Sequence, residues 1–215
     1  MMEKIDKQTW LRAENFELFN TFNHPHFNMC ANVDVSRLRR YIRSQGSSFT
    51  IGIVYMMSHA ANEIPEFRYR IRQDEIVVHD FVSPSITILV GNDLFSFCSI
   101  EYSPDFGEFS ERASRQIAAV KNNPTLKDPP GRDDLLFMTA IPWVSFTSFT
   151  HPMRQHPADS IPRFAWGKVF EDGKHEKMPL SVQGHHAVMD GIHIGKFYGL
   201  IQDYLDQPES ILGRE

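Results

Sequence analysis

The sequence predicts an α+β fold, in which one large mixed, mostly antiparallel sheet carries helices packed on it. Three observations lead to this prediction. Apolar residues recur at helical spacing through most of the first 64 residues, extended apolar segments separated by turn residues dominate the middle, and one more amphipathic segment follows near the C-terminus. No repeat and no linker-like stretch interrupts this order, so we expect a single domain over residues 1–215.

Helices are expected before the first strand. They cover Thr9–Thr21, Val33–Gln45 and Phe49–Ile64. Thr9 is a suitable N-cap, Gly46 is a typical C-terminal stop, and Pro65 cannot continue a helix. The segment Asn23–Asn32 between the first two helices is expected to be a loop.

The expected strands lie between residues 68 and 184. They are a hairpin over Arg68–Val78, then Ser85–Val90, Leu94–Glu101, Leu135–Ile141, Val144–Phe149, Ala165–Phe170 and Met178–Gly184. A helix over Ser110–Lys121 and a loop rich in Pro and Gly, Asn122–Asp134, interrupt them. After a loop at His185–Gly191, a final helix is expected, with Asp190 as its cap and Pro208 at its end.

Composition excludes several classes of protein. The chain is 41% hydrophobic and 23% charged, as ordinary globular domains are, and its net charge of −5 with no long basic block argues against a nucleic-acid partner. The apolar stretch at residues 49–61 is too short to cross a bilayer, and no secretory signal opens the sequence. Cys30 and Cys98 have no CxxC spacing, so we expect a reducing compartment and a cytoplasmic, membrane-free protein.

The stretch His185–Gly191, HHAVMDG, is the candidate for chemistry, because loops held by a strand and a helix often carry catalytic side chains. Adjacent residues at a strand end point to opposite faces, so His185 and His186 cannot share one role. The residues alone leave open a packed histidine, a general base, or a zinc site that includes Asp190 and His193. No HExxH motif supports zinc, and no GxSxG motif supports a serine nucleophile.

Two longer motifs narrow these alternatives. The segments PWVSFTSF (142–149) and PLSVQGHHAVMDG (179–191), supported by WLRAENF (10–16) and PEFR (65–68), resemble the chloramphenicol acetyltransferases of the trimeric, coenzyme A-dependent type. The resemblance covers nearly the whole chain. HxxxDG alone is also found in the acyltransferase cores of 2-oxo acid dehydrogenase complexes, whereas the double histidine together with PWVSFTSF is more specific.

The resemblance implies transfer of acetyl from acetyl-CoA to a hydroxyl of chloramphenicol, which inactivates the antibiotic, in a homotrimer with active sites between subunits and without a metal. His186 would be the general base in direct transfer without an acyl-enzyme, and its tautomer would be set by a hydrogen bond from the imidazole to the backbone. Ser148 would donate to the developing oxyanion. Asp190 would pair with Arg12 and hold the catalytic loop.

The resemblance also implies binding residues. Those matching the acceptor pocket are Leu18, Phe19, Phe27 and Phe95, and those matching the coenzyme site are Ser96 and Lys168. Several pocket positions differ from the well-known members: Phe19 replaces a Tyr, Asn23 an apolar residue and Ala165 a Thr, while Ser48, Thr50 and Val169 replace coenzyme contacts. Alternatives therefore stay open: another alcohol, or a thiol acceptor such as a dihydrolipoyl group, or a drug- or CoA-binding homologue with little catalysis.

Overall fold

The structure, a computed structural model, describes residues 2–128, 130–154 and 157–213. Within these residues the main sheet has the strand order β2-β10-β8-β7-β5-β6, and β9 pairs with β10. Its strands are β2 (His26–Asp34), β5 (Ser83–Gly91), β6 (Leu94–Ser99), β7 (Leu135–Ile141), β8 (Arg163–Gly167), β9 (Phe170–Asp172) and β10 (His175–His185). Only β5–β7 and β7–β8 are parallel among the described pairs, which confirms the predicted mixed, mostly antiparallel sheet.

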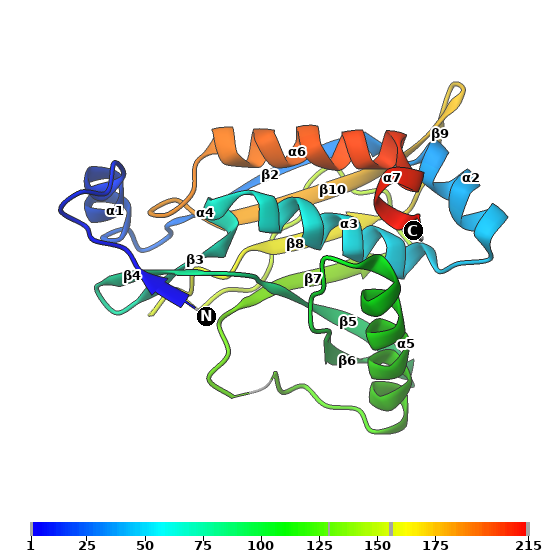
Figure 1. Ribbon diagram of the computed structural model, residues 1–215, viewed down its shortest axis with the longest axis horizontal. Helices are drawn as coiled ribbons and strands as arrows, with labels where there is room; N and C mark the ends of the chain where they lie inside the picture. The colour runs from blue at the N-terminus through cyan, green and yellow to red at the C-terminus, as the bar shows by residue number, and fades with distance from the viewer. Residues whose placement is uncertain (1, 129, 155–156, 214–215) are drawn as a thin grey trace.

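Helices cover one face of this sheet (Figure 1). They are α2 (Ser36–Gln45), α3 (Phe49–Glu63), α4 (Pro65–Arg68), α5 (Phe106–Asn122), α6 (Gly191–Asp206) and α7 (Pro208–Leu212), whereas α1 (Ala13–Phe19) lies beyond the end of the main sheet. Helices α3 and α6 lie side by side along the sheet, α5 packs against β5 and β6, and α1 lies at the opposite end from α2. Gly46 ends α2 as predicted, with a left-handed φ of 61° that favours glycine.

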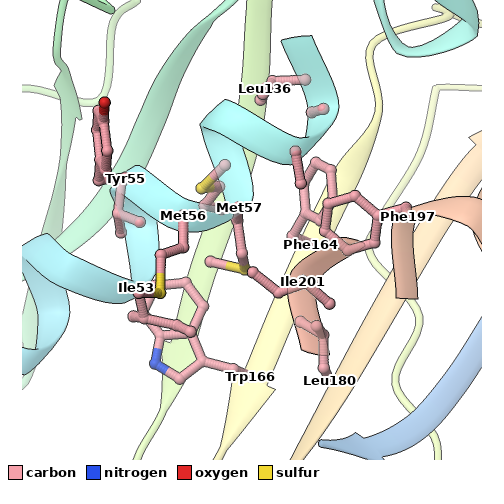
Figure 2. Close-up of a cluster of buried hydrophobic side chains, with 14 of the residues drawn as sticks. Ile53, Tyr55, Met56, Met57, Leu136, Phe164, Trp166, Leu180, Phe197 and Ile201 are labelled. Atoms are coloured by element: carbon pink, nitrogen blue, oxygen red, sulfur yellow. The ribbon is translucent and has the colours of Figure 1, made fainter. Parts of the chain in front are cut away.

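The main core fills the space between the helices and the sheet. Figure 2 shows Met56 and Met57 of α3 and Phe197 and Ile201 of α6 directed toward side chains of the strands below, such as Phe164. All of these are buried. Because burying one such side chain contributes about 1.5–3 kcal/mol, this layer holds α6, and the loop that precedes it, firmly against β10.

A smaller sheet, of order β1-β4-β3, lies beside α1. Its strands are β1 (Met2–Lys4), β3 (Tyr69–Arg72) and β4 (Glu75–His79). A second buried cluster joins Phe16 of α1 and Ile76 of β4 to Ala187 and Val188, which follow β10. The segment that carries the double histidine is therefore packed between α1 and the small sheet.

The face of the main sheet opposite the helices is polar along β10. Leu180 and Val182 point into the core, so Ser181, Gln183 and His185 point the other way. Residues 142–151, which we call the crossing segment, are held on this face by two hydrogen bonds: the Ser181 hydroxyl donates to the carbonyl of Phe149 (3.2 Å), and the backbone N–H of His151 donates to Gln183 Oε1 (3.2 Å).

This crossing segment corrects one prediction. Val144–Phe149 was expected to be a strand, but residues 142–149 form no strand and are largely exposed. The bonds described for its backbone are isolated ones, such as that from the N–H of Lys168 to the carbonyl of Val144 (2.9 Å). A strand needs a neighbouring strand to satisfy successive backbone groups, and within this chain the segment lies across the sheet instead of at its edge.

Other boundaries also differ. Asn23–Asn32 was expected to be a loop, yet β2 begins at His26 and pairs with β10 over its whole length. Its polar residues misled the prediction, because one face of β2 continues the polar face of the sheet. The first helix is shorter than predicted. The final amphipathic helix ends just before Pro208 as predicted, but Pro208 also opens a short helix, α7, that was not expected.

Among the described residues, no helix combines the length and the apolar character that a membrane span requires.

Candidate active site

The candidate active site is built around the turn that follows β10. His185 is the last residue of the strand, and its carbonyl accepts from the N–H groups of Val188 (3.1 Å) and Met189 (3.0 Å). The N–H of His186 donates to the carbonyl of Pro25 (2.8 Å), just before β2. Gly184 leaves room for this packing, because a Cβ atom on it would lie 2.5 Å from Met189 Sδ and the buried Met189 side chain would have to shift. The turn therefore folds back tightly on its own strand.

Arg12 and Asp190 form the predicted ion pair across this turn. Arg12 Nη1 contacts Asp190 Oδ2, and Arg12 Nη2 donates to Asp190 Oδ1 (3.0 Å) and to the carbonyl of His186 (3.4 Å). The side chains are only 14% and 27% exposed. The hydrogen bonds from Arg12 keep the pKa of Asp190 below its usual value, although burial acts in the opposite direction. One guanidinium thus holds both ends of the segment 186–190.

The imidazole of His186 lies between aromatic rings and this carboxylate. It stacks on Phe19 with ring centroids 3.9 Å apart and planes 4° from parallel, and Phe27 lies 4.8 Å away. His186 Nδ1 is 3.1 Å from Asp190 Oδ1, without the geometry of a hydrogen bond, and is buried. The expected hydrogen bond from this ring to the backbone does not occur among the described residues. Because the side chain is 33% exposed, Nε2 is the nitrogen open to a substrate.

His185 is a different kind of histidine. It is 3% exposed, and its Nδ1 accepts the N–H of Ala187 (3.2 Å). Burial, followed by the nearby His26, lowers its pKa to about 3, so the ring is neutral near pH 7. It supports the turn from inside while His186 faces outward, as expected for adjacent residues at a strand end.

Within one chain, several predicted site residues lie far from His186. Ser148 is exposed on the crossing segment, which meets β10 at Ser181, four residues or about 13 Å before His185. Phe95 lies on β6, four strand spacings or about 19 Å from β10. Lys168 is exposed between β8 and β9. The chain thus gathers Arg12, Asp190, His186, Phe19 and Phe27, with Leu18 exposed on the adjoining helix α1.

Ser96 does not fit the predicted coenzyme contact. Its side chain is fully buried, and its hydroxyl donates to the carbonyl of Thr125 (2.6 Å) and accepts the N–H of Thr125 (2.7 Å). Both bonds hold the loop after α5 against β6, and its only donor is already used. Ser96 is thus buried with its hydroxyl in use, whereas Lys168 is exposed.

The zinc alternative finds no support in this arrangement. Asp190 faces Arg12, and His193 Nδ1 accepts the N–H of Asp190 (2.9 Å). Its other nitrogen, Nε2, lies 3.3 Å from Glu66 Oε1. Within the ranges that the structure describes, no three His, Cys, Asp or Glu side chains are grouped as a metal site requires.

Two features of the site were not predicted from sequence. Phe19 was expected to line the acceptor pocket, and here it forms a wall for the imidazole of His186. Thr139 of β7 was not singled out. It stands opposite Ala165, which stands opposite Ser181, so the three residues lie side by side across the polar face where the crossing segment lies. No local pattern in the sequence signals either contact, because both depend on the packing of distant segments.

Comparisons with known proteins place this fold. A solved structure titled chloramphenicol acetyltransferase superposes with a TM-score of 0.85 at 29% identity and covers 95% of this chain and 100% of its own. The cubic core of the pyruvate dehydrogenase multienzyme complex superposes with a TM-score of 0.67 at 16% identity, over 93% and 88% of the two chains. The fold class is therefore that of the coenzyme A-dependent acyltransferases.

Sequence comparison identifies the family within this class. The family model for chloramphenicol acetyltransferase matches residues 1–202. The chloramphenicol acetyltransferase of Proteus mirabilis is 32% identical over 94% of both chains, and chloramphenicol acetyltransferase 2 of Escherichia coli is 31% identical over 93% of this chain and 94% of its own. The chain belongs to the chloramphenicol acetyltransferase family.

Proposed function

We propose that this protein is an O-acetyltransferase that moves acetyl from acetyl-CoA to a hydroxyl of chloramphenicol and so inactivates the antibiotic. One observation carries the proposal: in a chain of this family, the Arg12–Asp190 pair holds a turn from which His186 presents an open Nε2. The family relatives named above are chloramphenicol acetyltransferases by name.

In the proposed reaction, His186 Nε2 accepts the proton of the acceptor hydroxyl as its oxygen bonds to the carbonyl carbon of the acetyl thioester. Collapse of the tetrahedral species breaks the carbon–sulfur bond, and the same nitrogen returns the proton to the departing sulfur. No side chain becomes acetylated, and no metal takes part. The stacked ring of Phe19 and the fixed turn keep the imidazole in one orientation during both proton transfers.

Asp190 and Arg12 are proposed to position the base. Two guanidinium contacts hold the Asp190 carboxylate, so the positive charge of Arg12 largely balances its negative charge at the position beside His186 Nδ1. Arg12 also donates to the carbonyl of His186, which ties the backbone of the base to the same group. The pair therefore acts on the direction of the imidazole, and the proton passes through Nε2 alone.

We further propose a homotrimer with each site shared between two subunits. Ser148 as the oxyanion donor and Phe95 as a wall of the acceptor pocket would then come from the subunit next to the one that supplies His186, Leu18, Phe19 and Phe27. Support comes from the separations within one chain and from large apolar side chains exposed away from the helices. These are Leu89 of β5 and Phe95 of β6, and Trp143 and Val144 of the crossing segment.

The coenzyme side of the site rests on Lys168. It is exposed at the turn between β8 and β9, where its carbonyl accepts the Ser145 hydroxyl (2.7 Å), so its backbone is anchored while its ammonium group is free to meet a phosphate. Since acetyl-CoA is an intracellular cosubstrate, we place the reaction in the cytoplasm.

The test follows release of free thiol from acetyl-CoA. We expect release that depends on chloramphenicol in the wild type and is lost in His186→Ala. Turnover with dihydrolipoamide but not with chloramphenicol would refute the proposed acceptor. Chloramphenicol binding without thiol release would identify a binding protein, and activity that survives in His186→Ala would refute the mechanism.

A further inference from the structure

A third histidine, His26, lies where β10 ends and the catalytic turn begins. His26 opens β2 and stands directly opposite His185, the last residue of β10. The two rings meet edge to face, with centroids 4.9 Å apart and planes at 77°. His26 Nε2 donates to the backbone carbonyl of Asp159 (2.7 Å). His26 therefore connects the end of β10 with the segment that leads into β8.

The acceptor of this bond is itself rigid. Arg163 of β8 donates to both carboxylate oxygens of Asp159, at 2.9 and 2.7 Å, and also to the carbonyl of Ile161 (2.9 Å). Burial alone would raise the pKa of Asp159, but the bonds from Arg163 more than offset this and hold the pKa below its usual value. The carbonyl that accepts the hydrogen bond from His26 is thus fixed to the central part of the sheet.

Both histidines are in defined neutral forms near pH 7. His26 carries its proton on Nε2, because that nitrogen faces a carbonyl, and His185 carries no proton on Nδ1, because that nitrogen accepts the N–H of Ala187. Burial is the main reason that both pKa values are lowered. The nearby Asp159 carboxylate acts in the opposite direction and raises both pKa values. Arg163 lowers the pKa of His26 further, and His186 lowers the pKa of His185 further.

We propose that His26 is a positioning residue for acetyl transfer: by holding the end of β10 against the Asp159 segment, it sets the direction in which His186 leaves the strand. The connection is short. Pro25, the chain neighbour of His26, accepts the N–H of His186 at 2.8 Å, so a shift of His26 moves the backbone anchor of the base. This inference rests on His186 acting as the base in the proposed function.

Two substitutions separate the ring of His26 from its hydrogen bond. His26→Phe keeps an aromatic ring against His185 but cannot donate to Asp159, whereas His26→Gln keeps an N–H donor but has no ring. We expect kcat of His26→Phe to fall about tenfold or more with the KM for acetyl-CoA unchanged, because misplacing a reacting group by about 1 Å typically costs about a hundredfold. His26→Gln should retain most of kcat.

A matched control lies on the same strand. Cys30 is half-buried on the same face of β2, opposite Ser181 and away from the turn. Cys30→Ala tests the cost of disturbing β2, and its kcat should equal that of the wild type. Urea unfolding of all three variants shows whether any loss of kcat merely follows loss of stability.

A second measurement does not depend on turnover. The NMR signal of the His186 ring carbon between the two nitrogens, assigned with His186→Ala, should shift in His26→Phe and keep its position in His26→Gln. If the wild type shows no turnover with chloramphenicol, the proposed function fails, and this signal still tests the positioning. An unmoved signal with wild-type kcat in His26→Phe overturns the inference. Equal losses in all three variants, in proportion to stability, overturn it as well.

Discussion

Replacing Arg12 by Met should weaken both the fold and the reaction. The substitution removes two contacts to the Asp190 carboxylate and one to the carbonyl of His186. Hydrogen bonds to charged groups contribute about 1.5–3 kcal/mol each, but both side chains keep some access to water. We therefore expect a loss of about 2–3 kcal/mol in the free energy of unfolding, and not the 3–5 kcal/mol typical of a fully buried pair.

The same substitution should lower kcat about ten- to a hundredfold, because the base loses the anchor on its carbonyl and the carboxylate beside Nδ1 loses its partner. The double variant Arg12→Met/Asp190→Asn should be more stable than the sum of the single losses predicts, by about 1–2 kcal/mol, because no unpaired carboxylate remains. Urea unfolding measures the stability, and thiol-release kinetics measure kcat, of the wild type, the two single variants and the double variant.

A second part-buried pair supplies the control. Arg39 and Glu176 are each 29% exposed and join α2 to β10, far from the turn. Arg39→Met should lower stability by a similar amount and leave kcat unchanged. The reasoning is refuted if Arg12→Met and Arg39→Met lower kcat equally, or if the losses at Arg12 and Asp190 are simply additive.

Three further outcomes are expected. Ser148→Ala should lower kcat about 10²–10³-fold, because the oxyanion loses a donor. In equal refolded mixtures of Ser148→Ala and His186→Ala subunits, about a quarter of the shared sites should be intact and active. If Thr139→Val lowers kcat and Ser148→Ala does not, the donor is Thr139. Gly184→Ala should lower Tm, measured by thermal unfolding, because its Cβ would strike the sulfur in the turn. His185→Asn should flatten the pH dependence of stability between pH 4.5 and 6.5. With a folded pKa of about 3, below the value in the unfolded chain, wild-type His185 stabilises the fold above pH 6.5 and loses this effect as the pH falls, by up to about 1.4 kcal/mol per pH unit; an unchanged slope in urea unfolding contradicts this.

Periodicity predicted the parts of the fold that one segment determines by itself. The buried helix α3 and the amphipathic helix α6 appear where their apolar residues indicated. Periodicity failed to predict the structure of segments whose conformation depends on the strand with which they pair. The segment before residue 33 has polar residues that suggest a loop, but the unpaired edge of β10 makes it β2. Val144–Phe149 has the composition of a strand, but it pairs with none of the strands in the described part of the chain.

The site divides in the same way. The pair of Arg12 and Asp190 was predicted through the family resemblance, because both residues stand in motifs of defined register. The bond from His26 to Asp159 could not be, since its acceptor is a backbone carbonyl, which every residue has. The burial of Ser96 was equally hidden, because the loop that covers it returns from 29 residues further along the chain.

The separation of the site residues links assembly to catalysis. His186, the Arg12–Asp190 pair and two aromatic rings meet at one end of β10, whereas Phe95 lies four strands away and Ser148 lies on the crossing segment, which meets β10 at Ser181. Strands hydrogen-bonded in one sheet cannot exchange neighbours without unfolding, so no motion within a chain brings Phe95 to His186. A second copy can, and it would also cover the apolar side chains exposed there. Dilution that separates the subunits should therefore abolish turnover while the geometry around His186 persists.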